Sequence, residues 1–194
     1  MLILDVCCGS EKIYQGYQKN LGDSFITIDI RKGDFSYKRK NDWATHKIVV
    51  GPDVLADMRY LPFKDESIDA IVFDPPHLKC GENSYSYAYY GSWSQSDTIK
   101  MTNLVNVEFS RVLKPDTFLF LKTMGDRREI YETLFKSFVF FLPMQLKRPR
   151  GTFKNPKPDA DGAIWLIGCK KEKKQTDSSL DLFSLRLTWY NRRV

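Results

Sequence analysis

The stretch SIDAIVFD (Ser67–Asp74) has a continuous apolar middle and leads without a break into Pro75-Pro76-His77. A run of this kind predicts a strand buried on both faces, as in the parallel sheets of α/β proteins. Shorter apolar runs of the same type occur elsewhere along the chain. We therefore predict further strands at Leu2–Val6, Phe25–Ile30, Asp53–Asp57, Thr117–Lys122 and Ala163–Cys169.

Two segments between these strands carry apolar residues at helical spacing, which predicts helices at Asp97–Leu113 and Asp126–Phe138. Asp97 and Asp126 are candidate N-caps, and Lys114-Pro115 ends the first helix. This alternation predicts an α/β fold with a single doubly wound, mostly parallel, Rossmann-like sheet and a late antiparallel strand. Residues 1–170 would form the domain, and residues 171–194 a charged linker and a tail able to pack back on it.

Three intervening segments are predicted to be loops. Residues 31–47 are basic, residues 79–96 are rich in Gly, Ser and aromatic residues, and residues 147–162 are basic and rich in proline. The formal net charge is +6 and the sequence pI is about 9.0, which favours a polyanionic partner such as nucleic acid. A mildly basic charge without specific purpose is the plainer alternative.

The bulk composition favours a folded, cytoplasmic protein. With 194 residues, 42% of them hydrophobic and 28% charged, the chain fits one domain with a buried core. No apolar run is long enough to span a membrane, and the first residues make a poor signal peptide. The 4 cysteines include no C-x-x-C pair, so neither a zinc site nor a disulfide framework is expected.

The first predicted strand leads into the small-residue turn Asp5-Val6-Cys7-Cys8-Gly9-Ser10, a layout typical of nucleotide-type cofactor sites. About twenty residues later, Asp29 ends the next strand, where a carboxylate could grip a ribose diol. Asp57 could accept from an adenine amino group and Met58 could pack on its ring. Alternatively, the turn after the first strand is an ordinary strand–helix turn, and Asp57 only caps the turn after its strand.

Asp74-Pro75-Pro76 follows the strongest predicted strand. The prolines fix φ and lack N–H donors, which leaves outward-pointing carbonyls at the edge of the sheet where α/β ligands bind. A carboxylate and a proline carbonyl can hold the two hydrogens of an exocyclic amino group, so that the nitrogen lone pair faces an electrophilic methyl group. His77, in the fourth position, could stack on the base or act only as a turn residue.

The order LDVCCG, IDI, ADMRYLPF, IDAIVFDPPH resembles class I S-adenosylmethionine-dependent methyltransferases over roughly the first half of the chain. RVLKPDTFLFLK is similar to the helix–turn–strand that follows in these enzymes. The chain is also similar to small amino-methyltransferases of phage and prophage genomes. The resemblance implies S-adenosylmethionine as cofactor, a cofactor site at Asp5, Cys7, Gly9, Asp29, Asp57 and Met58, and a target-amine site at Asp74, Pro75, Pro76 and His77.

This chain departs from the family pattern in two places. His77 stands where the family usually has a larger aromatic residue. Gly9 is the only glycine of a turn that is usually richer in glycine.

Substrate contacts are expected from the aromatic segment after the motif and from the basic segments. The aromatic residues of this segment could stack on a base, or instead form a strand or pack as a lid: Tyr85, Tyr87, Tyr89, Tyr90 and Trp93. Arg148 and Arg150 could contact phosphates, or be ordinary surface charges.

The sequence favours a function in methylating an exocyclic amino group of a nucleic-acid base, with adenine in DNA as the first candidate substrate. An RNA base methyltransferase, a small-molecule or protein-amide methyltransferase and a non-catalytic binding domain remain as alternatives.

Overall fold

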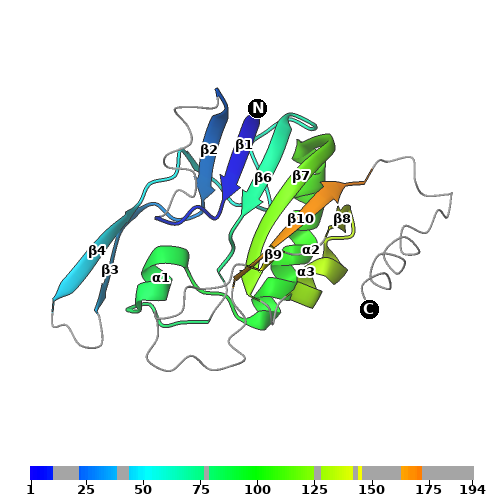
Figure 1. The fold of residues 1–194 in the computed structure, drawn as a ribbon. Helices are drawn as coiled ribbons and strands as arrows, with labels where there is room; N and C mark the ends of the chain where they lie inside the picture. The colour runs from blue at the N-terminus through cyan, green and yellow to red at the C-terminus, as the bar shows by residue number, and fades with distance from the viewer. Residues whose placement is uncertain are drawn as a thin grey trace.

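The computed structural model describes residues 1–10, 22–38, 44–76, 79–124, 128–141, 144–145 and 163–171. The strands of its main sheet are β1 (Leu2–Val6), β2 (Ser24–Asp29), β5 (Val54–Leu55), β6 (Ile68–Phe73), β7 (Leu113–Met124), β8 (Phe138–Phe140), β9 (Met144–Gln145) and β10 (Ala163–Lys170). The remaining elements are β3 (Gly33–Lys38), β4 (Thr45–Val50), α1 (Tyr85–Tyr90), α2 (Gln95–Val112) and α3 (Arg128–Leu134). Figure 1 shows their arrangement.

The main sheet has the strand order β5-β2-β1-β6-β7-β10-β8, and β9 also pairs with β10. β1 is parallel to both β2 and β6, and β6 is parallel to β7. β10 is antiparallel to β7 and to β8, between which it lies. The predicted mostly parallel, doubly wound sheet with a late antiparallel strand is therefore confirmed.

The predicted strands are all present, but two of them differ in extent. The segment Asp53–Asp57 contains only the short β5. At Asp53, side-chain bonds to Thr27 replace the backbone pairing: the Asp53 carboxylate accepts from Thr27 N (2.9 Å) and Oγ1 (2.6 Å), and Asp53 N donates to Thr27 Oγ1 (2.8 Å). β7 begins at Leu113 and includes Pro115. A register irregularity near the start of the β6–β7 pairing accommodates this proline.

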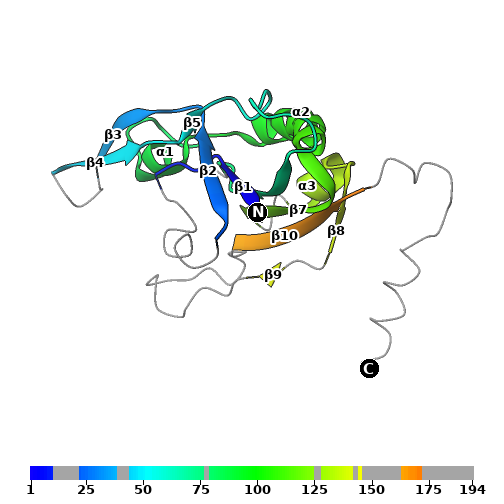
Figure 2. The same cartoon turned by 90° about the horizontal axis from the view of Figure 1, so that it is seen from above.

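The hydrophobic core lies between the sheet and the helices α2 and α3, which lie side by side on one of its faces (Figures 1 and 2). Phe73 of β6 packs edge-on against Phe109 of α2, with ring centroids 5.2 Å apart. Phe109 in turn stacks on Phe135 at 6.1 Å, and all three rings are fully buried. This packing fixes the end of β6, and therefore the start of the Asp74-Pro75-Pro76 segment.

The first predicted helix begins two residues earlier than expected. Ser94 is the N-cap of α2, and its side chain accepts from the Asp97 backbone N–H, while the Asp97 carboxylate accepts from Ser94 N at 2.8 Å. Asp97 is therefore the third residue of a capping box and not the N-cap. Serine and aspartate can both cap a helix, but the spacing Ser-x-x-Asp indicates a capping box with the serine as N-cap.

The second predicted helix, Asp126–Phe138, is shorter in the structure. α3 covers Arg128–Leu134, and Phe138 already belongs to β8, where it pairs with Lys170 of β10. Asp126 lies outside the described residues. Strand pairing with a distant part of the chain decides the conformation here, and the apolar spacing alone could not reveal it.

Two predicted loops contain regular structure. Within residues 31–47, β3 and the start of β4 belong to an antiparallel pair that projects away from the main sheet (Figure 1). Within residues 79–96, α1 forms between the N-cap Ser84 and the C-cap Gly91. The hairpin packs on α1 through rings: Tyr37 of β3 lies 5.2 Å from Tyr85 and 6.0 Å from Tyr89. The loop predictions for these parts were therefore wrong.

Candidate active site at the carboxyl edge of the sheet

The two sequence motifs meet where the strand order reverses. β1 and β6 are parallel neighbours, and Val6 pairs with Phe73 at their ends. The chain then continues towards β2 from one strand and towards β7 from the other. A doubly wound sheet binds its ligands in the crevice at such a point. The structure therefore brings the Cys7–Gly9 turn and the Asp74-Pro75-Pro76 segment to the same edge, as the sequence predicted.

The turn after β1 has an unusual backbone conformation. Cys7 and Gly9 have φ of 65° and 55°, in the left-handed region that favours glycine. Gly9 N donates to Asp29 Oδ2 at 2.9 Å, which joins the turn to the end of β2. A β-carbon at Gly9 would collide with the carbonyl oxygen of Tyr89 in α1. The glycine is thus required both by its φ and by the close approach of α1.

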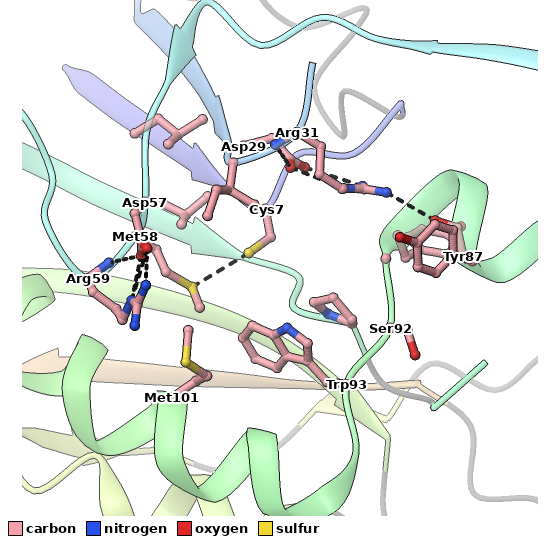
Figure 3. A pocket seen from close by; sticks show the side chains of 16 residues that line it. Cys7, Asp29, Arg31, Asp57, Met58, Arg59, Tyr87, Ser92, Trp93 and Met101 are labelled. Atoms are coloured by element: carbon pink, nitrogen blue, oxygen red, sulfur yellow. Dashed lines mark hydrogen bonds and ion pairs between the residues drawn. The ribbon is translucent and has the colours of Figure 1, made fainter. Parts of the chain in front are cut away.

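Asp29 is buried at the tip of β2 and is surrounded by donors. Besides Gly9 N, its carboxylate accepts from Arg31 N at 2.8 Å and from Arg31 Nε at 3.3 Å. The Arg31 guanidinium also donates to the backbone carbonyls of Tyr87 (3.0 Å) and Tyr89 (3.2 Å), as Figure 3 shows for Tyr87. Arg31 thereby connects the predicted ribose-binding carboxylate to the last turn of α1.

Asp57, which follows β5, has a similar neighbour. Both of its carboxylate oxygens accept from Arg59 Nε at 2.9 Å, and Oδ1 also accepts from Arg59 N at 2.9 Å. The Arg59 hydrogen bonds hold the pKa of Asp57 below its usual value, against the opposing effect of burial. Met58, between the two, is buried and lies 3.7 Å from the Cys7 sulfur.

A cavity of about 270 Å³ lies among these groups, close to the lower end of the range of about 300–1,000 Å³ for small-molecule sites. Its lining includes Cys7, Asp29, Arg31, Asp57, Met58 and Arg59 from the strand ends, Pro76 from the motif, Tyr87, Tyr90, Gly91, Ser92 and Trp93 from α1 and the segment after it, and Met101 from α2. Met58, Trp93 and Met101 converge on one part of the cavity (Figure 3). A flat, weakly polar ring would be well accommodated there.

The Cys7 thiol forms part of the cavity wall and is not suited to act as a nucleophile. Burial, reinforced by the negative charge of Asp29, raises the pKa of Cys7 well above its usual value. The reactive form of cysteine is the thiolate, and this environment keeps the sulfur protonated. Chemistry at this site therefore depends on other groups.

The target-amine motif lies beside the cavity. Pro76 lines it, whereas Asp74 is buried next to β7, where Lys122 Nζ lies 2.5 Å from Asp74 Oδ2. His77 lies outside the described residues. The structure therefore places the carboxylate and the prolines at the predicted edge and adds a lysine partner for Asp74.

The other predicted site residues are in varied positions. Asp5 is fully buried within β1, between Thr27 and Val72 of the adjoining strands, and does not line the cavity. Tyr85 and Tyr89 pack on each other, with centroids 4.3 Å apart, and on the hairpin. Arg148 and Arg150 lie outside the described residues.

Sequence reasoning missed Arg31 and Lys122. The repeated Asp-x-Arg pattern at the ends of two strands was available as a signal for Arg31. Lys122, a charged residue at the end of the apolar run TFLFLK, was another.

In the described part of the chain, no three His, Cys, Asp or Glu side chains are placed to hold a metal ion. Nor does any helix there have the length and apolar character needed to cross a membrane.

The residues present fit a nucleoside-containing cofactor. A buried carboxylate stands at the tip of β2, a positive-φ glycine turn follows β1, and sulfur and aromatic side chains form an apolar wall. The carboxylate suits the ribose of such a ligand, the glycine turn its polar end, and the apolar wall its base.

No protein-family model and no curated protein sequence matches this chain. Solved structures do. The PH0226 protein from Pyrococcus horikoshii OT3 has a TM-score of 0.54 at 13% identity, covering 88% of this chain and 82% of that one. TrmN from Thermus thermophilus has a TM-score of 0.55 at 15% identity, covering 89% of this chain and 44% of that one.

A third similar structure is a geranyl diphosphate C-methyltransferase from Streptomyces coelicolor A3(2), in complex with Mg²⁺, geranyl diphosphate and S-adenosyl-L-homocysteine. Its TM-score is 0.51 at 11% identity, covering 88% of this chain and 73% of that one. At these identities the three likenesses establish a common fold.

Proposed function

We propose that this chain is an S-adenosylmethionine-dependent methyltransferase that acts on an exocyclic amino group of a nucleic-acid base, with adenine in DNA as the first candidate. The observation that carries the proposal is the position of Asp74-Pro75-Pro76. This segment emerges at the reversal point of the sheet, and Pro76 borders the cavity that Asp29 and Cys7 also line. An amine held by the motif would therefore face a ligand in that cavity.

The cofactor would be held by groups already described. Asp29 would bind the ribose hydroxyls, the turn containing Gly9 would accommodate the methionine end, and Asp57 with Met58 would contact the adenine. The cofactor supplies an electrophilic methyl group on a sulfonium. The S-adenosyl-L-homocysteine complex of the geranyl diphosphate C-methyltransferase, which shares this fold, supports the choice of cofactor.

The chain's own contribution to the transfer is orientation. The Asp74 carboxylate and the Pro75 carbonyl would accept the two amino hydrogens, so that the nitrogen lone pair points into the cavity. Because neither proline has an N–H, no backbone donor at these positions competes for the same acceptors. The N–C bond would form as the methyl–sulfur bond breaks, which leaves a thioether, and the nitrogen would then lose its proton to water, so that no separate strong base is needed.

A nucleic-acid substrate is supported by charge and by aromatic surface. The chain carries 30 Lys and Arg against 24 Asp and Glu, and a basic surface attracts phosphates. Tyr90 and Trp93 line the cavity beside Pro76 and offer flat faces for an extruded base. We propose that these two rings, together with His77, hold the base, and that Arg148 and Arg150 contact the phosphates.

The test uses radiolabelled S-adenosylmethionine with unmodified DNA and, in parallel, unmodified total RNA, followed by digestion and identification of the labelled nucleoside. We expect amino-methylated adenine from DNA, and no label with Asp74→Ala. Label in RNA alone would replace DNA with RNA as the substrate. Absence of label in both polymers, with calorimetric cofactor binding intact, would overturn the nucleic-acid proposal.

A further inference from the structure

Asp74 has a charged partner on the neighbouring strand. Asp74 follows directly after β6, and Lys122 lies near the carboxyl end of β7, one position beyond the pairing of Phe73 with Leu121. The Lys122 ammonium lies 2.5 Å from Asp74 Oδ2, and the two side chains are 28% and 11% exposed. A charge-assisted bond between half-buried groups is both shorter and stronger than a neutral one.

The same two strands carry a second lysine–aspartate pair at their opposite end. Lys114 Nζ of β7 lies 2.6 Å from Asp69 Oδ1 of β6, and these side chains are 45% and 24% exposed. Asp69 Oδ2 also accepts from Leu2 N at 2.6 Å, which ties the start of β1 to the sheet. This pair does not border the cavity, so it provides a matched reference for a purely structural ion pair.

We propose that Lys122 is a positioning residue for methyl transfer and acts through Asp74. This inference rests on the proposed function and identifies a further residue that the reaction requires. The ammonium fixes one carboxylate oxygen, and with it the plane of the carboxylate that accepts the amino hydrogens. Lys122 itself comes from a neighbouring strand and would touch neither cofactor nor base.

The position of Lys122 in β7 explains why its side chain is held. Its neighbours along the strand, Leu121 and Thr123, are fully buried on the side of α2 and α3, so Lys122 faces the other side of the sheet. In the antiparallel pairing it lies opposite Trp165 of β10. β7 lies between β6 and β10, so Lys122 is in the interior of the sheet. From there its ammonium reaches Asp74 at the end of β6.

The test compares Lys122→Met and Lys122→Gln with Lys122→Arg and with the control Lys114→Met. Steady-state methylation kinetics, calorimetric cofactor binding and thermal denaturation would be measured for each variant. We expect both uncharged variants at position 122 to lower kcat by about 10- to 100-fold, because misplacing a reacting group by about 1 Å has that effect. Cofactor affinity should stay unchanged, and Lys122→Arg should recover most of kcat.

The control separates positioning from stability. Lys114→Met also removes a lysine–aspartate pair between β6 and β7, but it should leave kcat within about twofold of the wild type because that pair does not border the cavity. Equal kcat values for Lys122→Met and Lys114→Met in an active enzyme would overturn the inference and leave the proposed function standing. A wild type that methylates no nucleic acid would instead overturn the proposed function itself.

Discussion

Two turns of identical pattern stand side by side at the carboxyl edge of the sheet: Asp29-Ile30-Arg31 after β2 and Asp57-Met58-Arg59 after β5. In each, the aspartate accepts a hydrogen bond from the backbone N–H of the arginine two residues later, at 2.8 Å and 2.9 Å. The local structure is therefore the same, and so is the type of ion pair.

The two arginines differ in what else they contact. The Arg59 side chain donates to Asp57 and lies 5.7 Å from the centroid of the Tyr60 ring. Both contacts are with residues of the same turn. Arg31 binds Asp29 more loosely and donates to the last carbonyls of α1. Arg31 therefore connects the cavity to α1, whereas these contacts of Arg59 stay within its own turn.

The largest effect is expected from Asp29→Asn. This change removes the charge that Gly9 N and Arg31 share, and breaking a buried ion pair typically costs about 3 kcal/mol. We expect cofactor affinity, measured calorimetrically, to fall by about 100-fold, because a hydrogen bond to a charged acceptor would be lost together with its geometry.

Asp57→Asn is the matched variant at the other turn, and its effect on cofactor affinity should be several-fold smaller. Equal losses of cofactor affinity at the two positions would contradict the expectation that Asp29 contributes more to cofactor binding than Asp57.

Next in size is Gly9→Ala, which disturbs the contact between the cofactor turn and α1. The substitution forces a β-carbon into a residue with φ of 55° and against the Tyr89 carbonyl. The conformation alone costs about 1–2 kcal/mol, and the collision should push α1 away. Chemical denaturation and cofactor titration would measure both effects. Gly51→Ala, where nothing lies within 4 Å of the added carbon, should change neither quantity.

A smaller and more local effect is expected from Arg31→Met. The carbonyls of Tyr87 and Tyr89 would lose their guanidinium donor, and α1 would depend more on the packing of its tyrosines on the hairpin. Hydrogen exchange followed by mass spectrometry should show faster exchange in residues 85–91 and little change in α2. If Arg59→Met produced the same increase in residues 85–91, the two turns would not differ in the way proposed.

The smallest effect concerns pH and the second turn. Arg59 lowers the pKa of Asp57 in the folded protein, so this pair stabilises the fold above the unfolded value of 3.8 and loses that contribution as the pH falls through the folded value. Arg59→Gln should therefore lower the melting temperature by no more than about 2 °C at pH 7. The difference from the wild type should disappear at pH values below the folded pKa. A difference that persisted there would assign the stabilisation to packing on Tyr60.

The sequence predicted the parts of the fold that depend on local patterns. Continuous apolar runs such as Ser67–Asp74 identified the buried strands, and the parallel register then brought the ends of β1 and β6 together without further assumption. The hairpin β3–β4 was missed because its basic residues obscured an alternation in which Phe35, Tyr37 and Ile48 face α1 and lysines face outwards.

The candidate site was predictable to a similar degree. Asp29, Met58 and Trp93 were identified from strand ends and composition, and each of them lines the cavity. Arg31 and Lys122 were not, because their partners lie 56 and 48 residues away in the chain and become neighbours only when the sheet and α1 assemble. Tyr85 and Tyr89 differ from Tyr87 and Tyr90 only in helical phase, which the sequence did not reveal for a helix of this length.

The place of β10 has a consequence for how the protein is made. It is the last described strand to leave the ribosome, yet it lies in the interior of the sheet, bonded to β7 on one side and β8 on the other. A nascent chain that has not reached Ala163 leaves β8 and one edge of β7 without their partner strand, and open edges invite association with other chains. The main sheet is therefore completed only when β10 is inserted, and the demand for chaperones should be greatest just before that step.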